Sequence, residues 1–251
     1  HDNRSGWEEP LAINAMERFL GDWAVENRLP LARLPDNAGD EWIGVVGAGP
    51  SGLSFAYQLA RRGYRVTVYE AKEQAGGMLR YGVPDYRLPP AILDAEIARI
   101  LELGVELKVN TLIGRDITLE ELRKRHATLY LGLGAQQGRS LSIEGGDGPS
   151  VWRGIDYLSR INCGEKIELG THVIVIGGGN TAVDAARSAR RTGADVTVLY
   201  RRSREEMPAI QTEVDDMLER SNVLIACALL PGYKTRFEHH SQLPDSQHTV
   251  Y

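Results

Sequence analysis

Two glycine-rich turns each follow a short apolar run and precede a helical pattern: GAGPSG at residues 47–52 and GGGNTA at residues 177–182. In a G-x-G-x-x-G turn the first glycine permits a tight bend, and the second lets the main chain approach a diphosphate. The third lets the helix pack closely on the strand, while the unpaired N–H groups of the helix N-terminus attract the anion. Two such turns predict two dinucleotide sites on one chain.

The residues that end the strand after each turn predict different nucleotides. Glu70 ends the strand after the first turn, and a carboxylate there accepts hydrogen bonds from the ribose hydroxyls of FAD or NAD. Tyr200 takes the equivalent place after the second turn and is followed by Arg201, Arg202 and Arg204. Without the carboxylate a 2′-phosphate is not repelled, and guanidinium groups pair well with phosphate oxygens. The second turn therefore favours NADPH over NADH.

Two sites with opposite ribose preferences suggest that a nicotinamide delivers hydride to a flavin. The cofactors carry this chemistry, so we predict no catalytic side chain, and no acid–base pair is evident. The two cysteines, Cys163 and Cys227, lack the spacing of a zinc or iron–sulfur site, and His239, His240 and His248 lie in a polar tail. The sequence therefore predicts no metal site.

The elements that must position these turns alternate between strand and helix. Strands are expected at 43–46, 65–69, 105–109 and 128–133, and helices at 10–25, 50–62, 91–103 and 119–125. The pattern starts again at Thr171, and residues 47–70 align without a gap with residues 177–200. Alternation of this kind predicts an α/β fold with a parallel sheet.

The composition excludes several classes of partner. The chain has 251 residues, a net charge of −5 and 42% hydrophobic residues, with its basic residues scattered. This charge pattern argues against a nucleic acid or an anionic membrane as partner. No apolar run approaches the roughly 20 residues that cross a bilayer, and no signal layout opens the chain. We expect a cytoplasmic protein.

Three longer runs resemble a known family. They are AKEQAGGMLRYGVPDYRLP after Glu70, LGLGAQQGR at 131–139, and IGGGNTAVDAARSARRTGADVTVLYRRSREEMPA at 176–209. These runs resemble the glutamate synthase small (β) subunit family of FAD/NADPH oxidoreductases. Relatives of that family include the N-terminal half of dihydropyrimidine dehydrogenase and NADPH-linked ferredoxin oxidoreductase subunits. GWEEPLAINAMERFLGDWA, near the N-terminus, looks like the end of the family's helical iron–sulfur domain.

The resemblance implies two Rossmann-like doubly wound nucleotide-binding domains, an FAD domain with an inserted NADPH domain, after a short helical segment. The implied ranges are a helical segment at 1–40, the FAD domain at 41–140, a crossing between domains at 141–170, the NADPH domain at 171–227 and an irregular tail at 228–251. Both nucleotide domains would be incomplete, so we expect the chain to be a fragment.

The resemblance also assigns site residues by motif. On the FAD side these are Gly47, Gly49, Pro50, Ser51 and Gly52 at the diphosphate, Glu70 at the ribose, Gly77 and Met78 beside the flavin, Arg87 binding FAD, and the turn Gly134 and Ala135. On the NADPH side these are Gly177, Gly178, Gly179, Asn180 and Thr181 at the diphosphate, with Arg201 and Arg202 at the 2′-phosphate.

The implied function is transfer of hydride from NADPH to FAD, with electrons passing on to [4Fe-4S] clusters of a partner domain or a larger catalytic subunit. The family's cluster ligands lie upstream of this chain's first helix, and no cluster ligand is present in the sequence. A partner surface is expected around the helix at 10–25. The family's segment that closes over the flavin is not found after Met207, so we expect little activity from this chain alone. The alternative is a non-catalytic nucleotide-binding or assembly module that keeps the fold without turnover.

Overall fold

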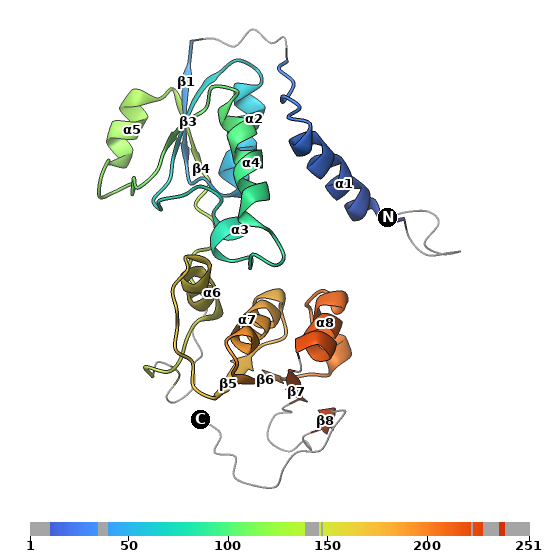
Figure 1. Cartoon of the computed structure of the whole chain (residues 1–251). Coiled ribbons are helices and arrows are strands. Elements are labelled where there is room, and N and C mark those ends of the chain that lie inside the picture. The colour runs from blue at the N-terminus through green and yellow to red at the C-terminus, as the bar shows by residue number, and fades with distance from the viewer. Residues whose placement is uncertain are drawn as a thin grey trace. The chain divides into compact units, whose positions relative to one another are not determined.

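Two four-stranded sheets organise the protein (Figure 1). The computed structural model describes residues 11–34, 40–138, 146, 148–221, 223–227 and 236–238. These residues form two compact units. The first comprises the described residues up to Leu79 together with Leu88–Gly134, and the second comprises Arg80–Arg87 and the described residues from Ala135 onward.

The sheet of the first unit is entirely parallel. Its strands are β1 (Trp42–Val46), β2 (Arg65–Tyr69), β3 (Glu106–Lys108) and β4 (Thr128–Leu131), in the order β3-β2-β1-β4. The helices are α1 (Ile13–Glu26), α2 (Pro50–Ala60), α4 (Pro90–Leu101) and α5 (Leu119–Arg125). The short helix α3 (Met78–Tyr81) spans the boundary between the two units.

Helices cover both faces of this first sheet. Figure 1 shows α2 and α4 on one side of the strands and α5 on the other. The buried side chains agree, because Leu53 and Ile97 pack with Val45 in one cluster, whereas Leu122 packs with Val46 in another. Coverage on both faces explains why strands β1 and β2 are almost continuously apolar instead of alternating.

The strand order of this sheet reverses at β1. From β1 the chain moves to β2 and β3 on one side, and then to β4 on the other side of β1. In open α/β sheets ligands bind outside the carboxyl ends of the strands, where the order reverses in this way. The first glycine turn directly follows β1, so it lies at that point. The predicted parallel α/β fold is confirmed.

The second unit repeats the strand, turn, helix and strand order. Its elements are α6 (Gly154–Asn162), β5 (His172–Ile176), α7 (Asn180–Arg191), β6 (Asp195–Tyr200), a 3₁₀ turn η1 (Arg204–Glu206), α8 (Gln211–Ser221), β7 (Leu224–Cys227) and β8 (Arg236–Glu238). Strands β5, β6 and β7 are parallel neighbours, and β8 pairs antiparallel with β7. Its core forms where α7 and α8 pack on the sheet, with Val183, Val198, Val214 and Met217 buried.

The first strands of the two sheets differ in burial despite their similar sequences. Strand β1 lies between β2 and β4, and four of its five residues are buried. Strand β5 has only β6 as a neighbour among the described strands, and its Ile174 and Ile176 are 47% and 49% exposed. The number of neighbouring strands therefore affects the burial of such a strand more than its residue pattern does.

Helix α8 lies where the sequence pattern predicted no element. Its signal was the spacing of Val214 and Met217, which stand three positions apart and both face the core. Strand β7 follows α8 directly in the chain. None of the helices in the described part of the chain has the length and apolar character that crossing a membrane requires.

The buried His126 predicts a pH dependence of stability in the first unit. Its ring packs edge-on against Trp42 and Tyr69, and its Nε2 lies 3.0 Å from the Tyr69 hydroxyl. Burial lowers the pKa of His126 below its usual value, and the nearby cations Lys108 and Arg125 act in the same direction. As the pH falls below about 6.5, the unfolded chain takes up this proton first, so the free energy of unfolding should fall.

Thermal melting between pH 7.5 and 5.5 checks this expectation. His126→Gln should melt with a flatter pH dependence than the wild type, whereas His172→Gln, which replaces a side chain that is 79% exposed, should follow the wild type. Equal slopes for the wild type and His126→Gln would contradict the assignment.

Candidate functional site

The first turn requires glycine at its first position. Gly47 has φ +98°, and its N–H donates to the Tyr69 carbonyl at 2.7 Å, which fixes the turn against the end of β2. A Cβ at this position would lie 2.4 Å from the carbonyl oxygen of Gly132. Both the backbone angle and the close neighbour therefore exclude any other residue.

The second and third glycines of this turn have different physical roles. A Cβ on Gly52 would lie 1.9 Å from the Gly47 carbonyl oxygen, so α2 can pack on the turn only without a side chain there. Gly49 caps α2 in an extended conformation, and a Cβ there would meet nothing closer than the Gly77 Cα at 3.7 Å. The fold tolerates a methyl group at Gly49, which leaves the close approach of a ligand as the reason for glycine.

The carboxylate of Glu70 is held beside the turn by main-chain donors. Glu70 is buried, and its two oxygens accept from the Ala48 N–H at 2.8 Å and the Lys72 N–H at 3.0 Å. Each oxygen keeps a lone pair that can accept another hydrogen bond. The structure therefore places the predicted ribose acceptor next to the turn.

The other predicted FAD residues of the first unit lie around this turn or along the chain from it. Gly77, with φ +54°, lies against Gly49, since a Cβ on it would be 2.6 Å from the Gly49 Cα. Met78 begins α3 and is half-buried. Gly134, with φ +64°, follows β4 and precedes the exposed Ala135. On α2, Pro50 is the first helical residue, and the Ser51 hydroxyl lies 2.6 Å from that of Tyr130.

The second turn reproduces the hydrogen bonding of the first. The Gly177 N–H donates to the Leu199 carbonyl at 3.0 Å, as Gly47 does to Tyr69, and Gly177 also has a positive φ of +139°. Gly179 caps α7 in an extended conformation, with open space where a Cβ would point. Ala182 stands in the third position.

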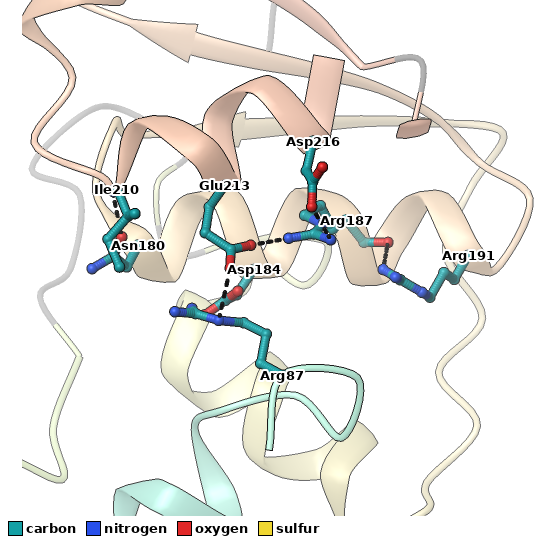
Figure 2. Close-up of polar contacts among 8 residues, drawn as sticks. All are labelled: Arg87, Asn180, Asp184, Arg187, Arg191, Ile210, Glu213 and Asp216. Carbon is teal, nitrogen blue, oxygen red and sulfur yellow. Dashed lines mark hydrogen bonds and ion pairs between the residues drawn. The ribbon is translucent and has the colours of Figure 1, made fainter. Parts of the chain in front are cut away.

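The start of α8 is attached to this second turn. The Asn180 side-chain oxygen accepts from the Ile210 N–H at 3.0 Å, as Figure 2 shows, and the Gly178 carbonyl accepts from the Ala209 N–H at 3.1 Å. Thr181 follows on the first turn of α7 and is exposed. Asn180 therefore has a structural role in addition to the predicted one at a diphosphate.

Two arginines at the end of β6 are available to an anion. Arg201 and Arg202 are exposed, and neither has an ion-pair partner within the part of the chain that the structure describes. Arg204, in contrast, pairs with Asp215. The two arginines assigned to the 2′-phosphate thus differ from Arg204, which already has a carboxylate partner.

A network of charged side chains, of which Asp184 and Arg187 are buried, joins α7, α8 and the segment Arg80–Arg87 (Figure 2). Arg87 donates to an Asp184 oxygen at 2.7 Å, and its Nε lies 3.6 Å from Glu213. Arg187 pairs with Glu213 and lies 3.6 Å from Asp216. Arg87, which the family resemblance assigned to FAD, therefore lies within the second unit with its guanidinium between two carboxylates.

Burial changes the acid–base properties of this network. Burial raises the pKa of Asp184, whose side chain is 6% exposed, although the Arg87 cation opposes the shift. Burial likewise raises the pKa of Tyr86, which lies beneath the guanidinium groups of Arg187 at 4.7 Å and Arg191 at 3.7 Å. Sequence analysis missed Asp184 and Arg187, although both stand on the helix face that carries Val183.

The arrangement supports binding more than acid–base catalysis. Among the described residues no cluster of His, Cys, Asp and Glu is placed to hold a metal ion. Cys163 is exposed, and the side chain of Cys227 lies outside the described part of the chain, as do His239, His240 and His248.

Two sheets, each with a glycine turn between its first strand and the helix that follows, define an α/β protein of the dinucleotide-binding class. The chain belongs to the pyridine nucleotide-disulphide oxidoreductase family, whose sequence pattern matches residues 41–227. This membership confirms the predicted oxidoreductase class.

The similar proteins also confirm the resemblance to the glutamate synthase small subunit family. The chain is 41% identical to the β subunit of an NADP(+)-dependent formate dehydrogenase from Moorella thermoacetica, over 85% of this chain and 34% of that protein. It is 34% identical to the small chain of glutamate synthase [NADPH] from Azospirillum brasilense, over 81% of this chain and 45% of that protein. The chain therefore spans less than half the length of either relative.

A solved structure supports the fold independently. Mycobacterium tuberculosis FprA in complex with NADPH superposes with a TM-score of 0.62 at 23% identity, over 72% of this chain and 48% of that chain. At this identity the likeness shows the fold alone.

Two glycines of the first turn predict different defects: one substitution should lower stability, and the other should lower nucleotide binding. Gly52→Ala should lower the free energy of unfolding by about 1–3 kcal/mol, because its methyl group overlaps the Gly47 carbonyl. Gly49→Ala should keep the wild-type melting temperature of the ligand-free protein and lose bound dinucleotide, which absorbance of the purified full-length protein measures. Equal loss of stability in both variants would contradict the division of roles.

The charge network predicts that two substitutions within it will have non-additive effects on stability. Arg187→Met should lower the free energy of unfolding by about 1–3 kcal/mol, because it removes the guanidinium that pairs with the partly buried Glu213 carboxylate. Adding Glu213→Gln should recover part of that loss, since the amide needs no counter-ion. Arg123→Met, at an exposed position on α5, is the matched control and should change stability by less than about 0.5 kcal/mol. Additive losses in the double variant would show that the network is not coupled.

Proposed function

We propose that this chain forms the electron-input module of a larger NADPH-dependent flavoprotein oxidoreductase. One observation carries the proposal. The two turns share the same backbone hydrogen bond, but the strand after each turn is followed by side chains of opposite charge. The carboxylate of Glu70 follows the first turn, and the guanidinium groups of Arg201 and Arg202 follow the second. Opposite charges at the ribose end favour one nucleotide with free ribose hydroxyls and another with a 2′-phosphate.

The first turn fits the diphosphate and ribose of FAD. The space over Gly49 lets an anion approach the N-terminus of α2, and Glu70 offers acceptors to the ribose hydroxyls. We propose that the residues lining this site are Gly47, Gly49, Pro50, Ser51, Gly52 and Glu70, with Gly77, Met78, Gly134 and Ala135 nearer the flavin.

The second turn fits the diphosphate and 2′-phosphate of NADPH. The open space at Gly179 parallels that at Gly49, and the exposed Arg201 and Arg202 supply the charge that a 2′-phosphate needs. We propose that the residues lining this site are Gly177, Gly178, Gly179, Asn180, Thr181, Arg201 and Arg202.

When bound, the two nucleotides supply the chemistry, which is hydride transfer from the nicotinamide to the flavin. The residues of this chain bind the nucleotides and orient them, and no acid–base pair is required for that task. The role of Arg87 at FAD stays a prediction, because two carboxylates of the second unit already neutralise its guanidinium.

The division into two compact units supports a plan with two nucleotide domains, and it differs from that plan in assigning Arg80–Arg87 and the described residues from Ala135 onward to the second unit. We propose an FAD domain at 41–140 and an NADPH domain at 171–227 inserted into it, with 1–40 as a helical segment, 141–170 as the crossing and 228–251 as an irregular tail. The β3-β2-β1-β4 order of the first sheet is that of a dinucleotide-binding half, which supports the first assignment.

Electrons are proposed to leave FAD for [4Fe-4S] clusters of a partner domain or larger catalytic subunit. The names of the relatives describe a β subunit and a small chain, which supports a partner. Helix α1 supports a contact surface, because Met16, Phe19 and Leu20 are each about 60% exposed or more. A cytoplasmic location is proposed from the two widely spaced cysteines alone.

Flavin reduction in the purified full-length protein tests the proposal. The protein should absorb near 450 nm, as flavins do, and lose this absorbance faster with NADPH than with NADH. The double variant Arg201→Ala/Arg202→Ala should lower the ratio of the NADPH and NADH rates by about 10–100-fold. This corresponds to about 1.5–3 kcal/mol for the pair, because solvent weakens the charged hydrogen bonds of exposed arginines.

Arg123→Ala on α5 is the matched control and should keep the wild-type ratio. Equal rates with NADH and NADPH in the wild type would overturn the arginine assignment and leave the flavin assignment standing. A colourless protein that binds neither nucleotide would favour the alternative, a non-catalytic assembly module.

A further inference from the structure

The hydroxyl of Tyr130, on β4, lies beside the start of α2. Its oxygen is 2.6 Å from the Ser51 hydroxyl oxygen, which is the separation of a hydrogen bond between two hydroxyls. Ser51 is the second residue of α2, directly behind the glycine turn, and the contact is exposed to solvent. A ligand that approaches the turn can therefore reach this pair of hydroxyls.

Strand β4 and helix α2 together hold the Tyr130 side chain. Tyr130 pairs with Val45 of the neighbouring strand β1, and its ring stacks on Phe55 with the ring centroids 4.1 Å apart and 9° between the ring planes. Phe55 stands four positions after Ser51 on α2, so these two residues lie on one face of the helix. The ring therefore runs along α2 and brings its hydroxyl to the first turn of the helix.

The glycine that follows β4 leaves room for this ring. Gly132 stands two positions after Tyr130, so both face the same side of the extended chain. A Cβ on Gly132 would lie 3.3 Å from the Tyr130 ring carbon Cε1 and 3.2 Å from the Gly52 nitrogen. Both separations are tight for a methyl group. Glycine at this position therefore lets the ring and the turn lie close together.

Two main-chain positions of the first turn cannot donate to an anion. The Ala48 N–H is already bonded to the Glu70 carboxylate, and Pro50, the first residue of α2, has no N–H. A side-chain donor at the start of α2 compensates for these missing main-chain donors. Ser51 follows Pro50 directly and is exposed, so its hydroxyl is placed to supply that donor.

The chemistry of the two hydroxyls decides which of them donates. A phenolic O–H is a better donor than an aliphatic one, and the serine oxygen is the better acceptor, so the Tyr130 O–H donates to Ser51. A hydroxyl has one proton and two lone pairs, and Ser51 therefore keeps its own proton for a third group. Because hydrogen bonds in a chain polarise one another, the Ser51 hydroxyl also becomes a stronger donor.

We propose that Tyr130 is a positioning residue for the diphosphate at the first turn, because its hydroxyl holds that of Ser51 in place to donate to a phosphate oxygen. This inference deepens the proposed function, on which it rests. A hydrogen bond to a charged phosphate oxygen is stronger than one between neutral groups. Tyr130 and Ser51 together thus add a side-chain donor to the main-chain donors at the start of α2.

FAD titrations of the full-length protein, after removal of its flavin, test the proposal. Tyr130→Phe keeps the ring on Phe55 and removes only the hydroxyl, so FAD binding should weaken about 3–10-fold while the melting temperature of the flavin-free protein stays unchanged. Tyr57→Phe is the matched control, because it removes a hydroxyl that accepts from Arg61 further along α2. It should bind FAD as the wild type does. Wild-type FAD affinity in Tyr130→Phe would overturn the inference.

A double-mutant cycle separates this role from a general effect on the helix. Ser51→Ala should weaken FAD binding at least as much as Tyr130→Phe does. Adding Tyr130→Phe to Ser51→Ala should cause little further loss, because the tyrosine acts through the serine, and additive losses would contradict the inference. A wild-type protein that binds no FAD would overturn the proposed function itself, and that result differs from equal FAD affinities of the wild type and Tyr130→Phe.

Discussion

Both units depend on a glycine at the carboxyl end of a strand, because the main chain there must come close to the neighbouring strand without a side chain between them. In each, a glycine N–H reaches back to a carbonyl of the following strand, from Gly47 to Tyr69 and from Gly177 to Leu199. This hydrogen bond fixes the turn, and the turn aims the N-terminus of the next helix outward. A helix N-terminus with unpaired N–H groups and a positive dipole end is suited to a phosphate. The rest of each sheet serves to hold that geometry.

The repeat shows how one backbone design can be given two specificities. The turns differ little in their main chain, so the difference lies in a few side chains at the next strand end. In the first unit a carboxylate there accepts from a turn N–H and is proposed to accept from ribose as well. In the second unit an aromatic ring and two arginines take its place, and we propose that they face a phosphate. This difference supports the proposal that the chain binds two related nucleotides and discriminates between them.

Sequence patterns predicted the parts of the structure that are local, and missed those that depend on distant contacts. The strand, turn, helix and strand around Gly47 were predictable because glycine spacing and apolar runs act within a few residues. The strand order was not, because it depends on pairing between distant segments. Asp184 and Arg187 were missed because charged residues on a helix normally face water, and here they are buried by partners from α8 and from Arg80–Arg87.

A crystal structure of the full-length protein with FAD and NADP⁺ tests the central claim most directly. The account predicts diphosphate oxygens of FAD within about 2.7–3.2 Å of main-chain N–H groups at the start of α2, and those of NADP⁺ equally close to the start of α7. A structure in which both nucleotides are bound but either glycine turn contacts no phosphate would contradict it.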